Sequence, residues 1–258
     1  MTSEETIHKL MQLKLNEMAH SFREQLDRSP GSALSVEECV GLMVDREWTE
    51  RENRRTARRI KDAKLGMPAC LEDLCCSPAR GIDKPTVRSL ATCQWVRAKQ
   101  NVIAVGATGT GKSYVAAALA EAACRRGYRA LRVRVPRLLG ELAIARADGS
   151  YHAALSRLAK LDVLVLDDLL IAPLKDGERR DLLEVLEDRY DRCSTVVTSQ
   201  IPIKTWHEML ADPTLADAIC DRLVHNAHVL WLKGPSMRKQ KGLEGKITEA
   251  EIMLEEKN

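Results

Sequence analysis

Aromatic side chains are scarce in this sequence: they make up 3% of the 258 residues and include a single phenylalanine. This scarcity disfavours proteins that read single-stranded nucleic acid by stacking bases on aromatic platforms. The net charge of +3 is too small to indicate a binding partner by itself. Apolar residues nevertheless make up 45% of the chain, which predicts a sizeable and mainly aliphatic core.

Metal-binding and targeting signals are also missing. The eight cysteines include no pair spaced as C-x-x-C, which argues against a structural zinc site and favours free thiols in a reducing cytosol. The N-terminal residues lack the basic and apolar regions of a secretory signal. No run of about 18 apolar residues is present, so no membrane-spanning helix is expected. We therefore expect a cytoplasmic protein with no membrane partner.

The chain is predicted to have three regions. In residues 1–65 apolar residues recur at helical spacing and only helices are predicted, which indicates a small all-helical N-terminal domain. Residues 66–242 are predicted to form an α/β domain, in which 66–95 is a connector with one short helix, and residues 243–258 a charged C-terminal tail. From Asn101 onward strands alternate with helices, which predicts a parallel sheet between helices. The expected strands are Val102–Val105, Arg129–Val135, Val163–Leu166, Thr195–Thr198 and His228–Leu232, and the expected helices are Lys112–Arg126, Pro136–Ala147, 177–190, Pro202–Leu210 and one that begins at Asp212-Pro213.

A glycine-rich loop lies between the first of these strands and the first of these helices. It fits the P-loop pattern G-x-x-x-x-G-K-[ST] at every fixed position. Glycines let the backbone N–H groups turn towards phosphates, and the next helix directs its positive N-terminal end at them. We expect Lys112 to reach the β- and γ-phosphates of ATP and Ser113 to bind Mg²⁺. The predicted cofactor-binding residues are Gly106, Ala107, Thr108, Gly109, Thr110, Gly111, Lys112 and Ser113.

Two acidic residues, Asp167 and Asp168, end the apolar strand expected at Val163–Leu166. Open α/β sheets bind ligands at the carboxyl ends of their strands. We therefore expect Asp167 to hold the Mg²⁺ shell and Asp168 to orient or deprotonate the attacking water. An acidic turn after an unrelated core strand is the alternative.

Polar residues Ser199 and Gln200 follow the strand expected at Thr195–Thr198. They would lie beside the two acids and could contact the γ-phosphate or its water. Ser199 is therefore predicted to be a further catalytic residue. An ordinary turn after a strand explains the two residues almost as well.

Two segments are rich in arginine. Residues 46–64 contain eight basic and four acidic residues, a net charge of +4, and spacings of three and four place several arginines on one helical face. Such a face suits contact with DNA phosphates, docking of an acidic protein partner, or simple solvation. The second segment, 125–137, has six arginines, two of which alternate with apolar residues along the expected strand. The predicted DNA-binding residues are Arg51, Arg54, Arg55, Arg58, Arg59, Arg132 and Arg134.

With these motifs assembled, the chain resembles the AAA+ ATPases of the IstB/DnaC group, and within it the IstB-type transposition helper ATPases of bacterial insertion sequences. The resemblance covers most of the chain and implies an AAA+ fold for the α/β domain. Many ATPases share the P-loop and the two acids. The arginine-rich residues 46–59, together with residues 221–228 and 233–239, are more specific to this group.

The resemblance also implies roles for two arginines. Arg222 matches the arginine finger that is supplied to the ATP of a neighbouring subunit, which would make homo-oligomerisation part of catalysis. Arg238 matches the sensor 2 arginine that contacts ATP from its own subunit. An ion pair of Arg222 with Asp217 or Asp221, and a solvated basic tail around Arg238, are the alternatives.

The sequence departs from this family in two places. Many AAA+ proteins have Glu where this chain has Asp168, one methylene shorter, which suits the slow hydrolysis of a timer better than motor-like turnover. An aromatic residue and a glycine often follow the two acids, whereas here Leu169-Leu170-Ile171-Ala172 follow them. The packing of that loop is therefore not predicted by the resemblance.

The resulting hypothesis is an ATPase that requires ATP and Mg²⁺ and helps DNA transposition. It would oligomerise on target duplex DNA, recruit and stimulate a transposase, and disassemble when ATP is hydrolysed. A DnaC-like replicative helicase loader is the first alternative, because it uses the same ATPase elements on single-stranded DNA. A metabolic P-loop phosphotransferase and a module that binds ATP without hydrolysing it are the others.

Overall fold

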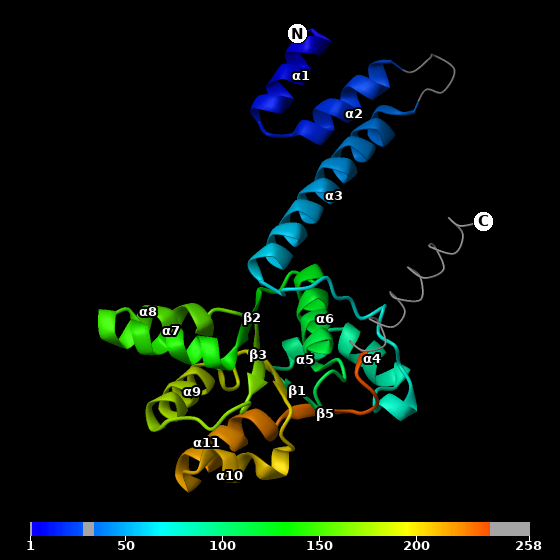
Figure 1. Ribbon diagram of the computed structural model, residues 1–258. Helices are drawn as coiled ribbons and strands as arrows, with labels where there is room; N and C mark the ends of the chain where they lie inside the picture. The colour runs from blue at the N-terminus through cyan, green and yellow to red at the C-terminus, as the bar shows by residue number, and fades with distance from the viewer. Residues whose placement is uncertain (1, 28–33, 238–258) are drawn as a thin grey trace, which may run out of the picture. The chain divides into compact units, whose positions relative to one another are not determined.

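The computed structural model describes residues 2–27 and 34–237 of the chain (Figure 1). The predicted tail at 243–258 and the sensor 2 candidate Arg238 lie outside these residues. The chain divides into two units, Met1–Arg58 and Arg59–Asn258, and helix α3 (Val36–Asp62) contributes residues to both. Among the helices of the described ranges, none is long and apolar enough to cross a bilayer.

The first unit is all-helical, in agreement with the sequence, and contains α1 (Ser3–Gln12), α2 (Asn16–Leu26) and most of α3. Thr2 and Glu5 form a capping box at the start of α1. No neighbouring side chain caps α2; instead Glu47 of α3 accepts hydrogen bonds from the backbone N–H groups of Glu17 and Met18, at 2.9 and 3.3 Å. Glu47 is thereby buried against α2 and ties the two helices together.

The second unit contains a five-stranded parallel sheet in the order β2-β3-β4-β1-β5. Because the strands are parallel, their carboxyl ends meet at one edge. Strand β4 lies between β1 and β3, so the segments that follow these three strands are neighbours at that edge. The strands are β1 (Asn101–Gly106), β2 (Ala130–Arg134), β3 (Val163–Leu169), β4 (Ser194–Ser199) and β5 (Ala227–Leu232).

Helices cover both faces of the sheet (Figure 1). Side chains alternate along each strand: Val102 and Ala104 of β1 pack on the side of α6, whereas Ile103 and Val105 pack with α7 to α11. The α6 side includes the 3₁₀ helix η1 (Pro78–Arg80), α4 (Lys84–Ala91), α5 (Gln94–Arg97) and α6 (Lys112–Arg125). The opposite side has α7 (Val135–Asp148), α8 (Tyr151–Ala159), α9 (Asp176–Arg189), η2 (Ile203–Thr205), α10 (Trp206–Leu210) and α11 (Pro213–Val224).

All five predicted strands are present, and their bounds lie within three residues of the predicted ones. Three details differ. Helix α8 is absent from the predicted elements, the helix expected at Pro202–Leu210 is divided into η2 and α10, and the connector at 66–95 holds η1 and α4 before α5 begins. These are short elements whose ends depend on packing against the sheet, so local sequence patterns specify them weakly.

Candidate nucleotide site and basic segments

The P-loop connects the carboxyl end of β1 to the first turn of α6, as predicted. Gly109 and Gly111 have φ angles of +85° and +99°, a region in which a Cβ is unfavourable. Gly111 is the N-cap of α6 and no side chain caps this helix end. The first N–H groups of α6 are therefore directed at the loop, where a phosphate can accept from them. The buried Lys112 lies under the loop, with Nζ donating to the Ala107 carbonyl at 2.8 Å.

A cavity of about 1550 Å³ opens beside this loop. Its lining combines P-loop residues 108–113 with Asp167 and Asp168 of β3, Gln200 after β4 and arginines from η1, α6 and β2. The predicted phosphate-binding and acidic residues therefore converge on one cavity. Its volume accommodates a nucleoside triphosphate, since ligand sites of this class span hundreds of cubic ångströms.

Asp167 lies at the centre of the polar contacts in this cavity. It is 1% exposed, and its Oδ1 accepts from Ser113 Oγ at 3.0 Å and from the hydroxyl of Thr198. Its Oδ2 forms an ion pair with Arg132. A serine hydroxyl and a carboxylate oxygen at hydrogen-bonding distance are oxygen donors of the kind that Mg²⁺ prefers beside phosphates. The residues present therefore fit the metal that the sequence predicts.

The backbone is strained just after Asp167. Asp168 and Leu170 have φ angles of +61° and +57°, and the pairing of β3 with β4 is irregular between Leu166 and Leu169. Non-glycine residues in this region are uncommon and concentrate at functional sites. The Asp168 N–H donates to Thr198 Oγ1 at 3.0 Å, and Arg134 Nε donates to the Asp168 carboxylate at 2.8 Å. The irregular end of β3 thus presents Asp168 to the cavity.

The structure places the end of β4 differently from the prediction. Ser199 is fully buried, and its hydroxyl donates to the Leu169 carbonyl at 2.9 Å and accepts from the Ile201 N–H at 3.1 Å. Thr198 contacts both acids instead, and Gln200 lines the cavity and accepts a hydrogen bond from Thr108 Oγ1 at 2.6 Å. Alternation along a strand places residues 198 and 200 on the same side and residue 199 on the other. The alternation of side chains along a strand could therefore have identified Thr198 and Gln200, and not Ser199, as the residues that face the cavity.

The arginines of β2, Arg132 and Arg134, which are predicted from the sequence to bind DNA, line the nucleotide cavity. Strand β2 pairs with β3 so that Arg134 is opposite Asp167 and Arg132 is opposite Val165. This register directs both arginines to the nucleotide cavity, where their guanidinium groups pair with the two acids. The sequence shows the alternation of these arginines, but the identity of the neighbouring strand comes from the tertiary structure.

Arg80 is a residue of this cavity that the sequence motifs do not include. Its Nη2 donates to the Thr110 carbonyl of the P-loop at 2.9 Å, and its own carbonyl accepts from Lys233 N–H at 2.9 Å. The last described residue, Met237, donates its backbone N–H to the Gly109 carbonyl at 2.9 Å. The chain after β5 therefore returns to the P-loop immediately before the sensor 2 candidate.

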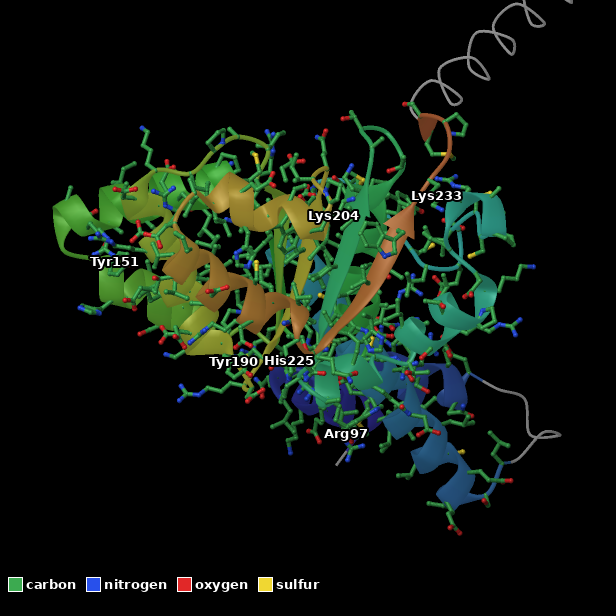
Figure 2. All side chains as sticks on the ribbon, turned by 90° about the horizontal axis from the view of Figure 1, so that it is seen from below. Arg97, Tyr151, Tyr190, Lys204, His225 and Lys233 are labelled. Carbon is green, nitrogen blue, oxygen red and sulfur yellow. The ribbon has the colours of Figure 1, made fainter. Side chains whose placement is uncertain are left out.

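Arg222 lies away from the nucleotide cavity, at the edge of the sheet where the parallel strands begin. Its carbonyl accepts from the side chain of Asn101, the first residue of β1, at 2.9 Å, whereas the P-loop follows the last residue of β1. Figure 2 shows Tyr190 and His225 near the start of β5 and Lys233 beyond its end. The Arg222 guanidinium pairs with Glu187 of α9, and this hydrogen bond raises the pKa of Arg222. The partner is thus Glu187 and neither of the two aspartates considered from sequence.

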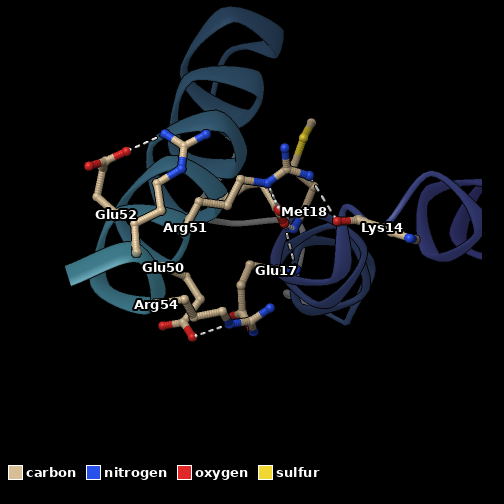
Figure 3. A network of polar contacts seen from close by, with 9 residues as sticks. Lys14, Glu17, Met18, Glu50, Arg51, Glu52 and Arg54 are labelled. Atoms are coloured by element: carbon tan, nitrogen blue, oxygen red, sulfur yellow. Dashed lines mark hydrogen bonds and ion pairs between the residues drawn. The ribbon is translucent and has the colours of Figure 1, made fainter. Parts of the chain in front are cut away.

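Three of the α3 arginines predicted to bind DNA take part in ion pairs within the first unit (Figure 3). Arg51 Nε donates to Glu47 at 2.6 Å and Arg54 Nε to Glu50 at 2.7 Å, while Arg55 pairs with Glu52 at 2.5 Å. Their side chains remain 43–59% exposed. The Arg54–Glu50 and Arg55–Glu52 pairs are exposed at both partners and contribute about 0–1 kcal/mol each, so a phosphate can exchange for the glutamate at little cost. Glu47 is buried, and removal of Arg51 would leave its carboxylate uncompensated.

The chain is similar to known ATP-binding proteins over most of its length. The family model described as "IstB-like ATP binding protein" matches residues 8–245. A putative insertion sequence ATP-binding protein of Sinorhizobium fredii is 43% identical over 239 residues, 93% of this chain and 98% of that protein. An insertion sequence putative ATP-binding protein of Pseudomonas aeruginosa is 32% identical over 240 residues, 93% of this chain and 91% of that protein.

Solved structures show the same fold at lower sequence identity. The DnaC helicase loader superposes with a TM-score of 0.54 at 20% identity and covers 66% of this chain and 100% of that chain. AMPPCP-bound DnaA from Aquifex aeolicus superposes with a TM-score of 0.55 at 16% identity, covering 72% and 56%. At these identities the likeness concerns the fold alone. The family match shows that the chain belongs to the family of IstB-like ATP binding proteins and is an ATPase, and its fold is that of a P-loop AAA+ protein.

Proposed function

We propose that this ATPase is a DNA-binding helper of transposition. In this proposal it oligomerises on target duplex DNA, recruits and stimulates a transposase, and disassembles when ATP is hydrolysed. The main support is the extent of the family match, which includes the helical N-terminal unit as well as the ATPase unit. Relatives named as insertion sequence ATP-binding proteins cover nearly the whole chain, whereas the DnaC structure matches 66% of it.

The proposed reaction uses the residues that converge on the cavity. Lys112 and the N–H groups of the loop would bind the phosphates of ATP, and Ser113 and Asp167 would hold Mg²⁺, which would neutralise the charge that develops during phosphoryl transfer. Asp168 would orient the attacking water. Its pairing with Arg134 fixes the position of the carboxylate at the cavity wall.

Oligomerisation follows in this proposal from the position of Arg222. An arginine that lies at the other edge of the sheet from its own P-loop reaches a γ-phosphate only in another copy of the chain. Arg222 is 22% exposed at its side chain and is held at the surface by Glu187. Assembly would have to exchange this ion pair for contact with the partner's ATP, which makes ATP at the interface a condition for a stable oligomer.

The test is ATP hydrolysis and DNA binding measured with no DNA, with single strands and with duplex. We expect stimulation by duplex, and Lys112→Ala should abolish ATP binding and hydrolysis while the fold survives. A preference for single strands would instead favour a helicase loader, and phosphate transfer to a small acceptor without any effect of DNA would favour a phosphotransferase.

The role of the α3 arginines needs a separate variant. Changing Arg54, Arg55, Arg58 and Arg59 together to Gln should weaken duplex binding equally for all sequences. The log–log dependence on salt should flatten by about one unit for each arginine–phosphate interaction that the change removes. Basal hydrolysis should stay unchanged, because none of the four arginines lines the nucleotide cavity. Unchanged salt dependence combined with failure to capture the transposase would show that this face docks the protein partner.

A further inference from the structure

Arg132 of β2 contacts both the nucleotide cavity and the segment that follows α3. Its backbone N–H donates to the Ala63 carbonyl at 2.8 Å, and its Nη1 donates to the Leu65 carbonyl at 2.6 Å. Its Nη2 forms the ion pair with Asp167 Oδ2. A single residue therefore links the junction at residues 63–66, where the chain leaves α3, to the carboxylate at the centre of the site.

Burial distinguishes this ion pair from its neighbours. Three arginine–aspartate pairs join β2 to β3. Arg132–Asp167 and Arg134–Asp168 lie within the strands, and Arg129–Asp162 lies just before them. The side chain of Arg132 is only 14% exposed, whereas those of the other two arginines are 62% and 61% exposed. An exposed pair contributes little to stability, but removal of one partner from a buried pair leaves an uncompensated charge.

The Arg132 guanidinium is also constrained by the junction. Its Nε is buried and has no hydrogen-bond partner in the described part of the chain, and Gly66 lies so close that an added Cβ would come within 2.8 Å of Nη1. Because the guanidinium is planar and rigid, a rotation that weakens its contact with Asp167 also shifts its contact with Leu65. The two contacts are therefore mechanically coupled.

We propose that Arg132 is a positioning residue that competes with Mg²⁺ for the Asp167 carboxylate. When Mg²⁺ displaces Arg132 from Asp167, the hydrogen bonds of Arg132 to the junction at residues 63–66 weaken as well. This inference rests on the proposed Mg²⁺ site of Ser113 and Asp167. Two cations that share one buried carboxylate oppose each other's binding. Arg132 therefore lowers the affinity of the site for Mg²⁺, and bound Mg²⁺ weakens the hold of Arg132 on Asp167 and Leu65.

The experiment compares wild type with Arg132→Gln and Arg132→Lys, and Arg129→Gln is the matched control from the same arginine series. The dissociation constant of a fluorescent, non-hydrolysable ATP analogue is measured in excess Mg²⁺ and in EDTA, and the ratio of the two constants gives the gain from Mg²⁺. A neighbouring opposite charge changes the proton affinity of a carboxylate by about 1–3 log units. We therefore expect Arg132→Gln to increase the gain from Mg²⁺ by about ten-fold or more, Arg132→Lys to keep it near wild type because the charge remains, and Arg129→Gln to leave it unchanged.

Amide hydrogen exchange of residues 63–66 and 132 provides the second readout. In wild type, Mg²⁺ with the analogue should accelerate exchange of the Arg132 amide, which donates to Ala63, relative to EDTA. This response should disappear in both Arg132 variants. A wild type with no gain from Mg²⁺ would refute the proposed metal site itself. A normal gain in wild type that Arg132→Gln leaves within two-fold, with an intact exchange response, would refute the role of Arg132.

Discussion

Thr198 is the residue whose substitution tests the geometry of the site most directly. Its hydroxyl donates to Asp167 and accepts from the Asp168 N–H, so Thr198→Val removes one hydrogen bond to each acid without changing the side-chain volume much. A lost hydrogen bond to a charged group costs about 1.5–3 kcal/mol and an unsatisfied buried N–H about 1–3 kcal/mol. Since Asp168 is partly exposed and water can reach it, we expect a loss of about 2–4 kcal/mol in the free energy of unfolding.

Hydrolysis should fall more than stability alone explains. Thr198 fixes both the acid proposed for Mg²⁺ and the acid proposed for the attacking water, and misplacement of such groups by about 1 Å costs up to about 100-fold in rate. We expect a decrease in kcat of about ten-fold to 100-fold, measured by steady-state phosphate release at saturating ATP and below the unfolding temperature. Thr198→Ser keeps the hydroxyl and should recover most of the rate.

Ser199→Ala is the matched control, because Ser199 is the next residue, is equally buried and also makes two hydrogen bonds through its hydroxyl. Its loss should destabilise the fold by about 1–3 kcal/mol but change kcat by less than two-fold. If Ser199→Ala abolished hydrolysis while Thr198→Val did not, the assignment of the two faces of β4 would be refuted. That result would support the catalytic role expected from sequence for Ser199.

Two further predictions concern other parts of the chain. Arg222→Ala should keep ATP binding but lower hydrolysis by about 10³-fold. Mixing this variant with Lys112→Ala should restore some phosphate release. Normal turnover by Arg222→Ala alone would mean that Arg222 only forms a surface ion pair with Glu187. Glu47→Ala should accelerate amide exchange of α2 through loss of about 1–2 kcal/mol of capping. Burial raises the pKa of Glu47, but hydrogen bonds from Arg51 and the α2 backbone outweigh this and lower it below the ordinary 4.5. The stabilisation is therefore complete above about pH 4.5 and disappears as pH falls through the folded-state pKa. The protection factor of the α2 amides, which corrects their exchange rate for its intrinsic pH dependence, should fall accordingly, and a protection factor that stays constant between about pH 6 and 3 would refute this prediction.

The sequence predicts the strand–loop–helix of the nucleotide site well, because a P-loop is a local motif whose chemistry depends on adjacent residues. Gly109, Gly111 and Lys112 lie where their spacing indicates. The two acids are predicted for the same reason, since an apolar strand that ends in Asp167 and Asp168 is legible without tertiary information. All five strands follow from the alternation of apolar and polar segments.

Site residues that depend on the order of the strands or on the path of a connector could not be assigned from the sequence. The arginines of β2 belong to the nucleotide site only because β2 pairs with β3, and the sequence does not state which strand is its neighbour. Arg80 reaches the P-loop from a connector that has no recognisable motif. Helix α8 shows apolar residues Tyr151, Leu155 and Leu158 at helical spacing, but nine residues give a weak signal beside the longer α7.

The left-handed backbone at Asp168 restricts which acidic side chain this position can hold. Aspartate tolerates that conformation better than longer side chains do, because its short carboxylate can hydrogen-bond locally. Replacing it with the glutamate that many AAA+ proteins carry would add a methylene at a corner where the backbone is already strained. The shape of the backbone at the end of β3 therefore favours the shorter acid. A longer acid could occupy this position only if the backbone through Leu170 also changed its conformation.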